Sequence, residues 1–156
     1  MDLSGVGAAE LEITLQPTVA RSFDAEYAQR YAPLVRLLWS LTGSWALAEE
    51  IAQEAFVAAY RSWPTVSALD RSDLWIRRVA INRAISVHRK LVSEAAALTR
   101  VRTPSAVEPQ FSGEDEQLWK AVRKLPRRQA AAVVLSTIEG LTAEEVGSVL
   151  DCSGET

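Results

Sequence analysis

The sequence predicts an all-helical protein. Apolar residues recur at three- and four-residue spacings among abundant Ala, Leu, Glu and Arg, which is the period of an amphipathic helix. Strict alternation of β-branched or aromatic residues with polar residues, the pattern of a half-buried strand, does not occur. With 48% hydrophobic residues in 156 positions, the chain can fold around a core and is long enough for one ordinary domain or two small helical ones.

The first 21 residues are expected to form a mobile extension, because they mix Gly, Ser and Ala with Pro17 and show no sustained period. Residues 1–16 carry acids but no base, which argues against a signal or transit peptide, and no stretch approaches the roughly 18 apolar residues of a membrane span. A single cysteine, Cys152, and a single histidine, His88, predict neither an internal disulfide nor a metal site. We therefore expect a cytoplasmic protein without membrane insertion.

Two helices are expected after this extension. The first begins at Phe23, where apolar residues start to recur at helical spacing, and ends at Gly43. Ser44 is the predicted N-cap of the second helix, which Pro64 closes. One face of this second helix is predicted to be buried, and it consists of Ala48, Ala52, Ala55, Phe56, Ala59 and Trp63.

A basic helix is expected to follow a loop over residues 65–71. Ser72 is its predicted N-cap, and the helix should run into the low nineties. From Arg71 to Arg102 there are eight lysines and arginines against two acids, although the whole chain carries a net charge of −3. Such a local excess of positive charge favours a polyanionic partner.

The chain is predicted to divide into two units. Residues 22–91 form the first, and residues 92–113, which are rich in Pro, Ser and Gly, form a linker. The second unit, 114–156, opens on three acids, which favour a helix N-terminus. Its next helix should start at Pro126 and end near Gly140.

The end of the chain has the pattern of a helix-turn-helix. Thr142 and Glu145 form a predicted capping box, Asp151 and Cys152 a tight turn, and Ser153 the cap of a further helix. A helix in this last position would enter the DNA major groove, but the printed sequence lacks it. The pattern also fits a helical hairpin that packs against protein. Without the further helix, we expect a short apolar face to be exposed and able to drive self-association, formed by Val146, Val149 and Leu150.

Two groups of motifs carry a resemblance to a known family. Ala48–Phe56, Leu74–Asn82 and the pair Arg89-Lys90 resemble region 2 of the sigma-70 family. Further along, Leu125–Gln129 and Ile138–Ser153 resemble the start of region 4, joined by a short linker as in members of the extracytoplasmic-function (ECF) type. The resemblance implies an all-α protein in which a region-2 helical bundle is linked to an incomplete helix-turn-helix region-4 module that lacks the recognition helix.

The resemblance also implies two binding surfaces. The polar face of the second helix would bind core RNA polymerase, although three glutamates on a helix are often only a solvated face. This acidic face consists of Glu49, Glu50, Gln53 and Glu54. The loop after that helix and the basic helix would bind and open promoter DNA at the minus-ten element, with Asn82 either contacting a base or bonding the nearby backbone. The implied DNA-binding residues are Val66, Ser67, Ala68, Leu69, Asp70, Arg77, Arg78, Asn82, Arg83, Arg89 and Lys90.

The expected function is therefore that of an ECF RNA polymerase sigma factor in transcription initiation. Core RNA polymerase, promoter DNA and an anti-sigma factor are the expected partners. No glycine-rich phosphate loop or nucleophile beside a base is present, so we expect neither an enzyme nor a cofactor. The alternative is a sigma-like decoy that binds an anti-sigma factor or polymerase without initiating transcription.

Overall fold

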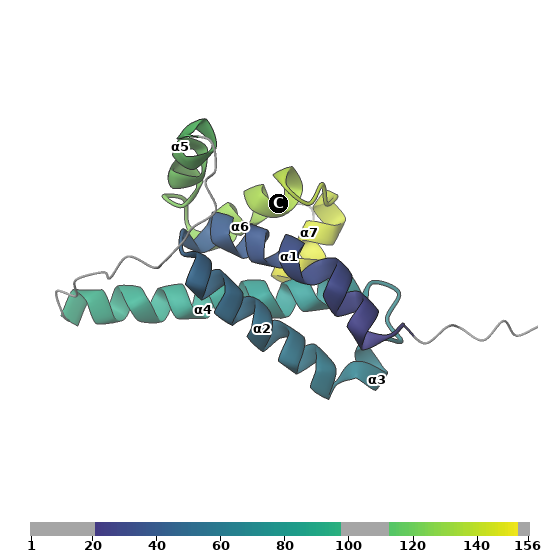
Figure 1. Ribbon diagram of the computed structural model, residues 1–156. Coiled ribbons are helices and arrows are strands. Elements are labelled where there is room, and N and C mark those ends of the chain that lie inside the picture. The colour runs from purple at the N-terminus through teal and green to yellow at the C-terminus, as the bar shows by residue number, and fades with distance from the viewer. Residues whose placement is uncertain (1–20, 98–112, 153–156) are drawn as a thin grey trace, which may run out of the picture.

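A computed structural model describes residues 21–97 and 113–152 of the chain. These residues form helices and no strand (Figure 1), so the predicted all-α class is confirmed. The helices are α1 (Phe23–Thr42), α2 (Trp45–Arg61), α3 (Trp63–Val66), α4 (Ser72–Ala97), α5 (Gly113–Val122), α6 (Arg127–Thr137) and α7 (Ala143–Leu150).

The junction between α1 and α2 forms as the sequence predicts. Gly43 adopts a left-handed φ of 69°, and its N–H donates to the Trp39 carbonyl oxygen at 2.7 Å. A residue without a Cβ adopts this conformation at little cost, so glycine ends the helix here. The Ser44 hydroxyl then accepts from the Leu47 N–H at 3.3 Å and caps α2.

The segment between α2 and α4 differs from its prediction. Pro64 does not close α2, which ends at Arg61, but lies in the first turn of the short helix α3, where the missing N–H costs little. Part of the predicted loop 65–71 is therefore helical. α4 includes Ser72 and continues to Ala97, which takes it beyond the expected end of the first unit and into the expected linker.

Among the C-terminal helices, α7 carries its predicted cap. α6 ends at Thr137, and its C-cap is Ile138 rather than the predicted Gly140, whose φ is 63°. The capping box of α7 is complete: the Thr142 N–H donates to a Glu145 carboxylate oxygen at 2.8 Å, and the Glu145 N–H donates to the Thr142 hydroxyl at 3.2 Å. Asp151 ends α7 with a left-handed φ of 56°. Ser153, the predicted cap of a further helix, lies outside the described residues.

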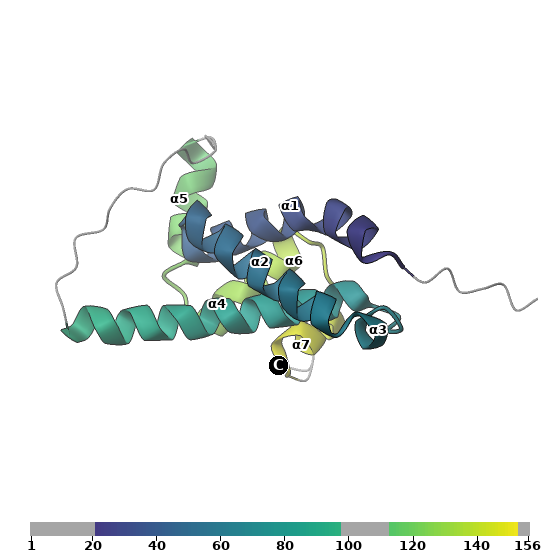
Figure 2. The same cartoon turned by 60° about the horizontal axis from the view of Figure 1, so that its bottom comes forward.

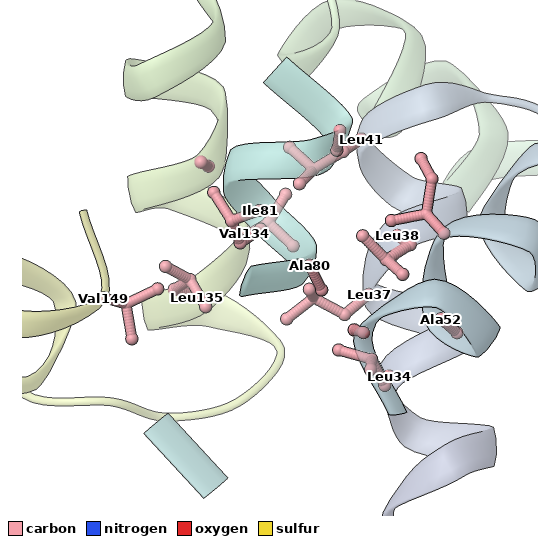
Figure 3. Packing of buried hydrophobic residues seen from close by; sticks show 14 of the residues in the cluster. Leu34, Leu37, Leu38, Leu41, Ala52, Ala80, Ile81, Val134, Leu135 and Val149 are labelled. Carbon is pink, nitrogen blue, oxygen red and sulfur yellow. The ribbon is translucent and has the colours of Figure 1, made fainter. Parts of the chain in front are cut away.

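One hydrophobic core joins the two predicted units. Val134 and Leu135 of α6 and Val149 of α7 are fully buried, and they belong to the same cluster as Leu37 of α1 and Ile81 of α4 (Figure 3). The prediction that the apolar face of α7 would be exposed was wrong, since Val149 and its neighbours are buried where α7 packs on α4 and α6. The linker therefore connects two helical units that share their interior.

The long helix α4 organises the arrangement. α1 and α2 pack on each other and on α4, while α6 lies between α1 and α4 and α7 lies against the N-terminal half of α4 (Figure 2). In both views the C-terminal half of α4 extends past these helices, and α5 stands near the end of α1. The two halves of α4 consequently have different surroundings.

Candidate functional site

The acidic face of α2 is presented to solvent. Glu50, Gln53 and Glu54 are exposed and Glu49 is half-buried, while the opposite face of the helix packs on α1 and α4. The Gln53 side-chain amide donates to the Tyr31 hydroxyl of α1 at 3.5 Å, and partial burial raises the pKa of the Tyr31 phenol. The four predicted residues are thus brought together on one accessible helix face.

Two apolar side chains extend this face toward the end of α2. Val57 is 47% exposed and Tyr60 is 66% exposed, so both present apolar surface to solvent beside the glutamates. The Tyr60 ring meets Phe23 of α1 edge to face at 5.0 Å, so it is held in place although it is accessible. Tyr60 was not among the predicted site residues, but its position seven residues after Gln53 places it on the same helix face.

The loop over residues 66–70, which is predicted to bind promoter DNA, is anchored at its first residue. Val66 is 1% exposed and belongs to the interior, and Ser67 is half-buried. Ala68, Leu69 and Asp70 are exposed, and the Leu69 N–H donates to the Val66 carbonyl oxygen at 3.1 Å. Only the second half of the loop is therefore available for contact in this conformation.

Arg77, the first predicted DNA-binding arginine of α4, is held between two carboxylates. Its guanidinium lies 2.9 Å from an Asp73 oxygen and donates to Glu139 from Nε at 2.8 Å. All three side chains are at most 13% exposed. Burial of the Asp73 carboxyl acts to raise its pKa, but a hydrogen bond from Arg71 and the charges of Arg77 and Arg30 hold that pKa below its usual range. The Arg77 guanidinium therefore contacts two protein carboxylates and is largely shielded from solvent.

Arg71 and Arg78 also pair with carboxylates of the C-terminal helices. Arg71 contacts Glu145, and Arg78 lies 3.0 Å from an Asp151 oxygen. A hydrogen bond from the Thr142 N–H and, to a smaller extent, one from Arg71 lower the pKa of the Glu145 carboxyl. Arg71 was not among the predicted site residues, although its position between the loop and α4 could have indicated it. Arg71, Arg77 and Arg78 each contact one carboxylate that follows α6 in the chain. We call them the paired arginines.

The remaining predicted residues of α4 are accessible. Asn82, Arg83, Arg89 and Lys90 are all exposed along its middle and C-terminal half, and we name them the exposed group. Arg83 Nη2 donates to a Glu54 oxygen at 3.3 Å, and this bond raises the pKa of Arg83. The predicted DNA-binding set is thus split. Arg77 is 13% exposed beneath the C-terminal helices, Arg78 is 43% exposed and pairs with Asp151, and the exposed group faces solvent.

A groove of about 800 Å³ runs between α4, the α1–α2 junction and α5–α6. His88, Leu47, Val92 and Arg127 are among its lining residues. Burial, and then the charge of Arg127, lowers the pKa of His88, which favours the neutral imidazole. Over the described ranges no cluster of His, Cys, Asp or Glu could hold a metal ion, and no helix is long and apolar enough to cross a membrane.

Comparison with known proteins finds two matching families. Residues 27–93 match Sigma-70 region 2, and residues 115–156 match Sigma-70, region 4. The chain is 30% identical to the RNA polymerase sigma factor CarQ of Myxococcus xanthus over 125 residues, which cover 77% of this chain and 72% of CarQ.

In two further relatives, the matched residues cover a smaller share of the relative than they do in CarQ. The ECF RNA polymerase sigma factor SigE of Mycolicibacterium smegmatis is 29% identical over 152 residues, covering 92% of this chain and 59% of SigE. The ECF RNA polymerase sigma-E factor of Escherichia coli K12 is 23% identical over 120 residues, covering 66% of this chain and 62% of that factor. The chain therefore spans less than two thirds of these two relatives.

Proposed function

The chain belongs to the sigma-70 family, in its ECF group, and from this membership we propose that it directs core RNA polymerase to promoters and stabilises the melted minus-ten element. The observation that carries the proposal is the pair of accessible surfaces of opposite charge on α2 and α4. They meet at the Glu54–Arg83 ion pair. The relatives are named as sigma factors, which favours initiation over the decoy function.

The acidic face of α2 is the proposed polymerase-binding surface. Its exposed glutamates suit a basic partner, and complementary charge speeds encounter and fixes register. Val57 and Tyr60 add apolar area beside the charges, and interfaces commonly bury an aromatic side chain near a polar rim. We therefore include Tyr60 in the proposed interface.

Binding of the purified chain to core RNA polymerase tests this proposal. In the test variant, Glu49→Lys and Glu50→Lys reverse two charges of the acidic face and leave the Glu54–Arg83 pair intact. A matched control, Asp24→Lys with Glu116→Lys, makes the same change in net charge at exposed acids on α1 and α5. We expect the test variant to bind at least tenfold more weakly than the control, which corresponds to about 1.4 kcal/mol. Equal affinities, or no binding by the parent chain, would contradict the proposal.

The exposed group on α4 and residues 68–70 form the proposed surface for the open promoter strand. Arginine and lysine neutralise phosphates, while an unpaired base offers faces and edges to a loop or an amide. A surface that prefers the single strand stabilises melted DNA by its differential affinity, without making or breaking a bond. We thus propose a binding function and no catalytic one.

We propose that the chain acts in the cytoplasm, where it binds polymerase and promoter DNA. An anti-sigma factor stays a predicted partner. Co-purification of the chain with core polymerase from a bacterial lysate, followed by transcription from a minus-ten-containing template, would test the whole assignment. Polymerase that binds the chain but gains no promoter activity would favour the decoy instead.

A further inference from the structure

Arg21 joins the start of α1 to the loop that precedes α4. Its carbonyl oxygen accepts from Nε1 of Trp63 in α3 at 3.0 Å. Its guanidinium donates from Nη1 to the Ser72 hydroxyl at 3.1 Å and to the Asp70 carbonyl oxygen at 3.5 Å. The Phe23 ring meets the Trp63 ring edge to face at 5.3 Å, so α3 is held beside the first turn of α1 (Figure 1). Arg21 thus contacts α3, the last residue of the loop and the first residue of α4.

The Ser72 hydroxyl belongs to a buried polar network. Ser72 is 0% exposed, and its hydroxyl donates to a Glu26 carboxylate oxygen at 3.4 Å. Glu26 is 6% exposed and pairs with Arg30 at 2.5 Å, and Arg30 lies 3.8 Å from an Asp73 oxygen. Buried polar groups need such partners, and a satisfied network favours one arrangement of its members. Arg21 therefore contacts a network that links α1 to the first turn of α4.

We propose that Arg21 is a positioning residue for the loop over residues 66–70, and that it holds residues 68–70 in one arrangement for an unpaired base of the open promoter strand. Val66, 1% exposed, anchors the loop at its first residue, and Arg21 anchors it at its last. Arg21 precedes residues 27–93, so the match to Sigma-70 region 2 does not assign this role. The inference rests on the proposed DNA-binding function of the loop and adds a residue that controls its shape.

The two anchors matter because recognition of a base depends on geometry. A hydrogen bond weakens steeply when its angle departs from the preferred range, so a loop that occupies several arrangements discriminates poorly between bases. A loop that is fixed before binding also loses less conformational freedom when it binds. Ala68, Leu69 and Asp70 are exposed between the anchors, and they are the residues whose positions Arg21 controls.

A direct contact between Arg21 and DNA is the alternative that the experiment must separate. Unlike the paired arginines, Arg21 donates to a hydroxyl and to a carbonyl oxygen, and the residue is exposed. A phosphate contact would strengthen binding to every sequence alike and would add to its dependence on salt. Loss of a positioning residue instead reduces the discrimination between bases.

Three variants separate these roles. Arg21→Met removes the donors and the charge but keeps the aliphatic stem. Ser72→Ala removes the acceptor and leaves Arg21 and the net charge unchanged. Arg36→Met is the matched control, because Arg36 is an exposed arginine of α1 outside the network. Circular dichroism checks that each variant is helical, and if one of the two test variants does not fold, the other is judged alone.

The first measurement is hydrogen exchange in the free chain, followed by mass spectrometry. We expect the amides of residues 67–72 to exchange about fivefold faster in Arg21→Met and Ser72→Ala than in Arg36→Met, because one hydrogen bond typically stabilises local structure by about that factor. Equal exchange rates in the test variants and the control would mean that Arg21 does not hold the loop. That result would overturn the inference and leave the proposed function standing.

The second measurement uses each variant bound to core RNA polymerase. The complex selects strands from a pool of single-stranded DNA with random bases, and sequencing gives the base preference at each position. We expect the strongest preference of the control to fall about fivefold in the test variants, with an unchanged salt dependence.

The outcomes of this selection are distinct. A preference equal to that of the control would overturn the inference. So would a uniform loss of affinity in Arg21→Met with a salt slope smaller by about 0.7, because that is the sign of a lost phosphate contact to a single strand. If the parent complex selects no sequence, the proposed function is contradicted, and the inference fails with it.

Discussion

Replacing Arg77 with methionine is expected to lower the free energy of unfolding by about 2–3 kcal/mol. Removing one partner of a buried ion pair costs about 3–5 kcal/mol when the other charge is left alone. Here Asp73 keeps Arg71 at 3.0 Å and Arg30 at 3.8 Å, so only Glu139, 11% exposed, loses its ion pair within the described residues. Methionine retains the aliphatic stem, so the loss reports the charge more than the packing.

A double-mutant cycle separates this pair from its surroundings. The four proteins are the parent, Arg77→Met, Glu139→Gln and the double variant, each unfolded in urea and followed by circular dichroism. We expect the double variant to be more stable than the sum of the single changes predicts, with a coupling energy of about 1–2 kcal/mol, because it leaves neither charge buried alone. A coupling below about 0.5 kcal/mol would refute the idea that Arg77 and Glu139 depend on each other across the interface.

Three other predictions follow from residues already described. Replacing Arg89 and Lys90 with alanine should weaken binding of holoenzyme to single-stranded DNA and reduce the slope of log affinity against log salt by about 1.4, if each contacts one phosphate. Because the folded pKa of Asp73 lies below its ordinary value of 3.8, the stability that it contributes is present above that pH and is lost as pH falls below it, so Asp73→Asn should flatten the acid limb of a pH–stability curve. Gly140→Ala should destabilise the fold by about 1–2 kcal/mol, because position 140 has a left-handed φ. Gly43→Ala should destabilise it by more, since a Cβ at position 43 would also lie 3.1 Å from Nε of Arg123.

Each of these predictions has an outcome that contradicts it. An unchanged salt slope would place Arg89 and Lys90 away from phosphate. An Asp73→Asn protein that loses stability in acid as steeply as the parent would show that another carboxyl dominates there. Equal thermal unfolding midpoints for the two glycine variants would mean that the arginine side chain moves aside without cost.

The sequence predicts the local features of the fold well, because they depend on neighbouring residues. Ser44, Gly43 and the Thr142–Glu145 box form the expected caps, since each bonds a backbone group within a few positions. The excess length of α4 has a local cause too: residues 94–97 are Glu-Ala-Ala-Ala, which are strong helix formers, and the breakers come later.

The sequence could not predict the partners of the charged residues. Arg77 and Glu139 are 62 positions apart, and nothing in either neighbourhood indicates the other. Arg77 and Arg83 are alike as sequence positions, both arginines of a basic helix, yet one is buried beneath the C-terminal helices and the other is half exposed. The shared core is missed for the same reason, since an apolar face such as that of α7 does not specify which helix covers it.

The alanines beneath the acidic face have a consequence for how binding energy is used. Ala48, Ala52, Ala55 and Ala59 are at most 1% exposed and are four of the six buried residues of α2, so most of its buried side chains have no rotamers to lose. The backbone of α2, rather than a set of adjustable side chains, sets the direction in which the glutamates point. A partner that docks on this face meets a backbone that is already ordered, so only the side chains of the face remain to be ordered on binding.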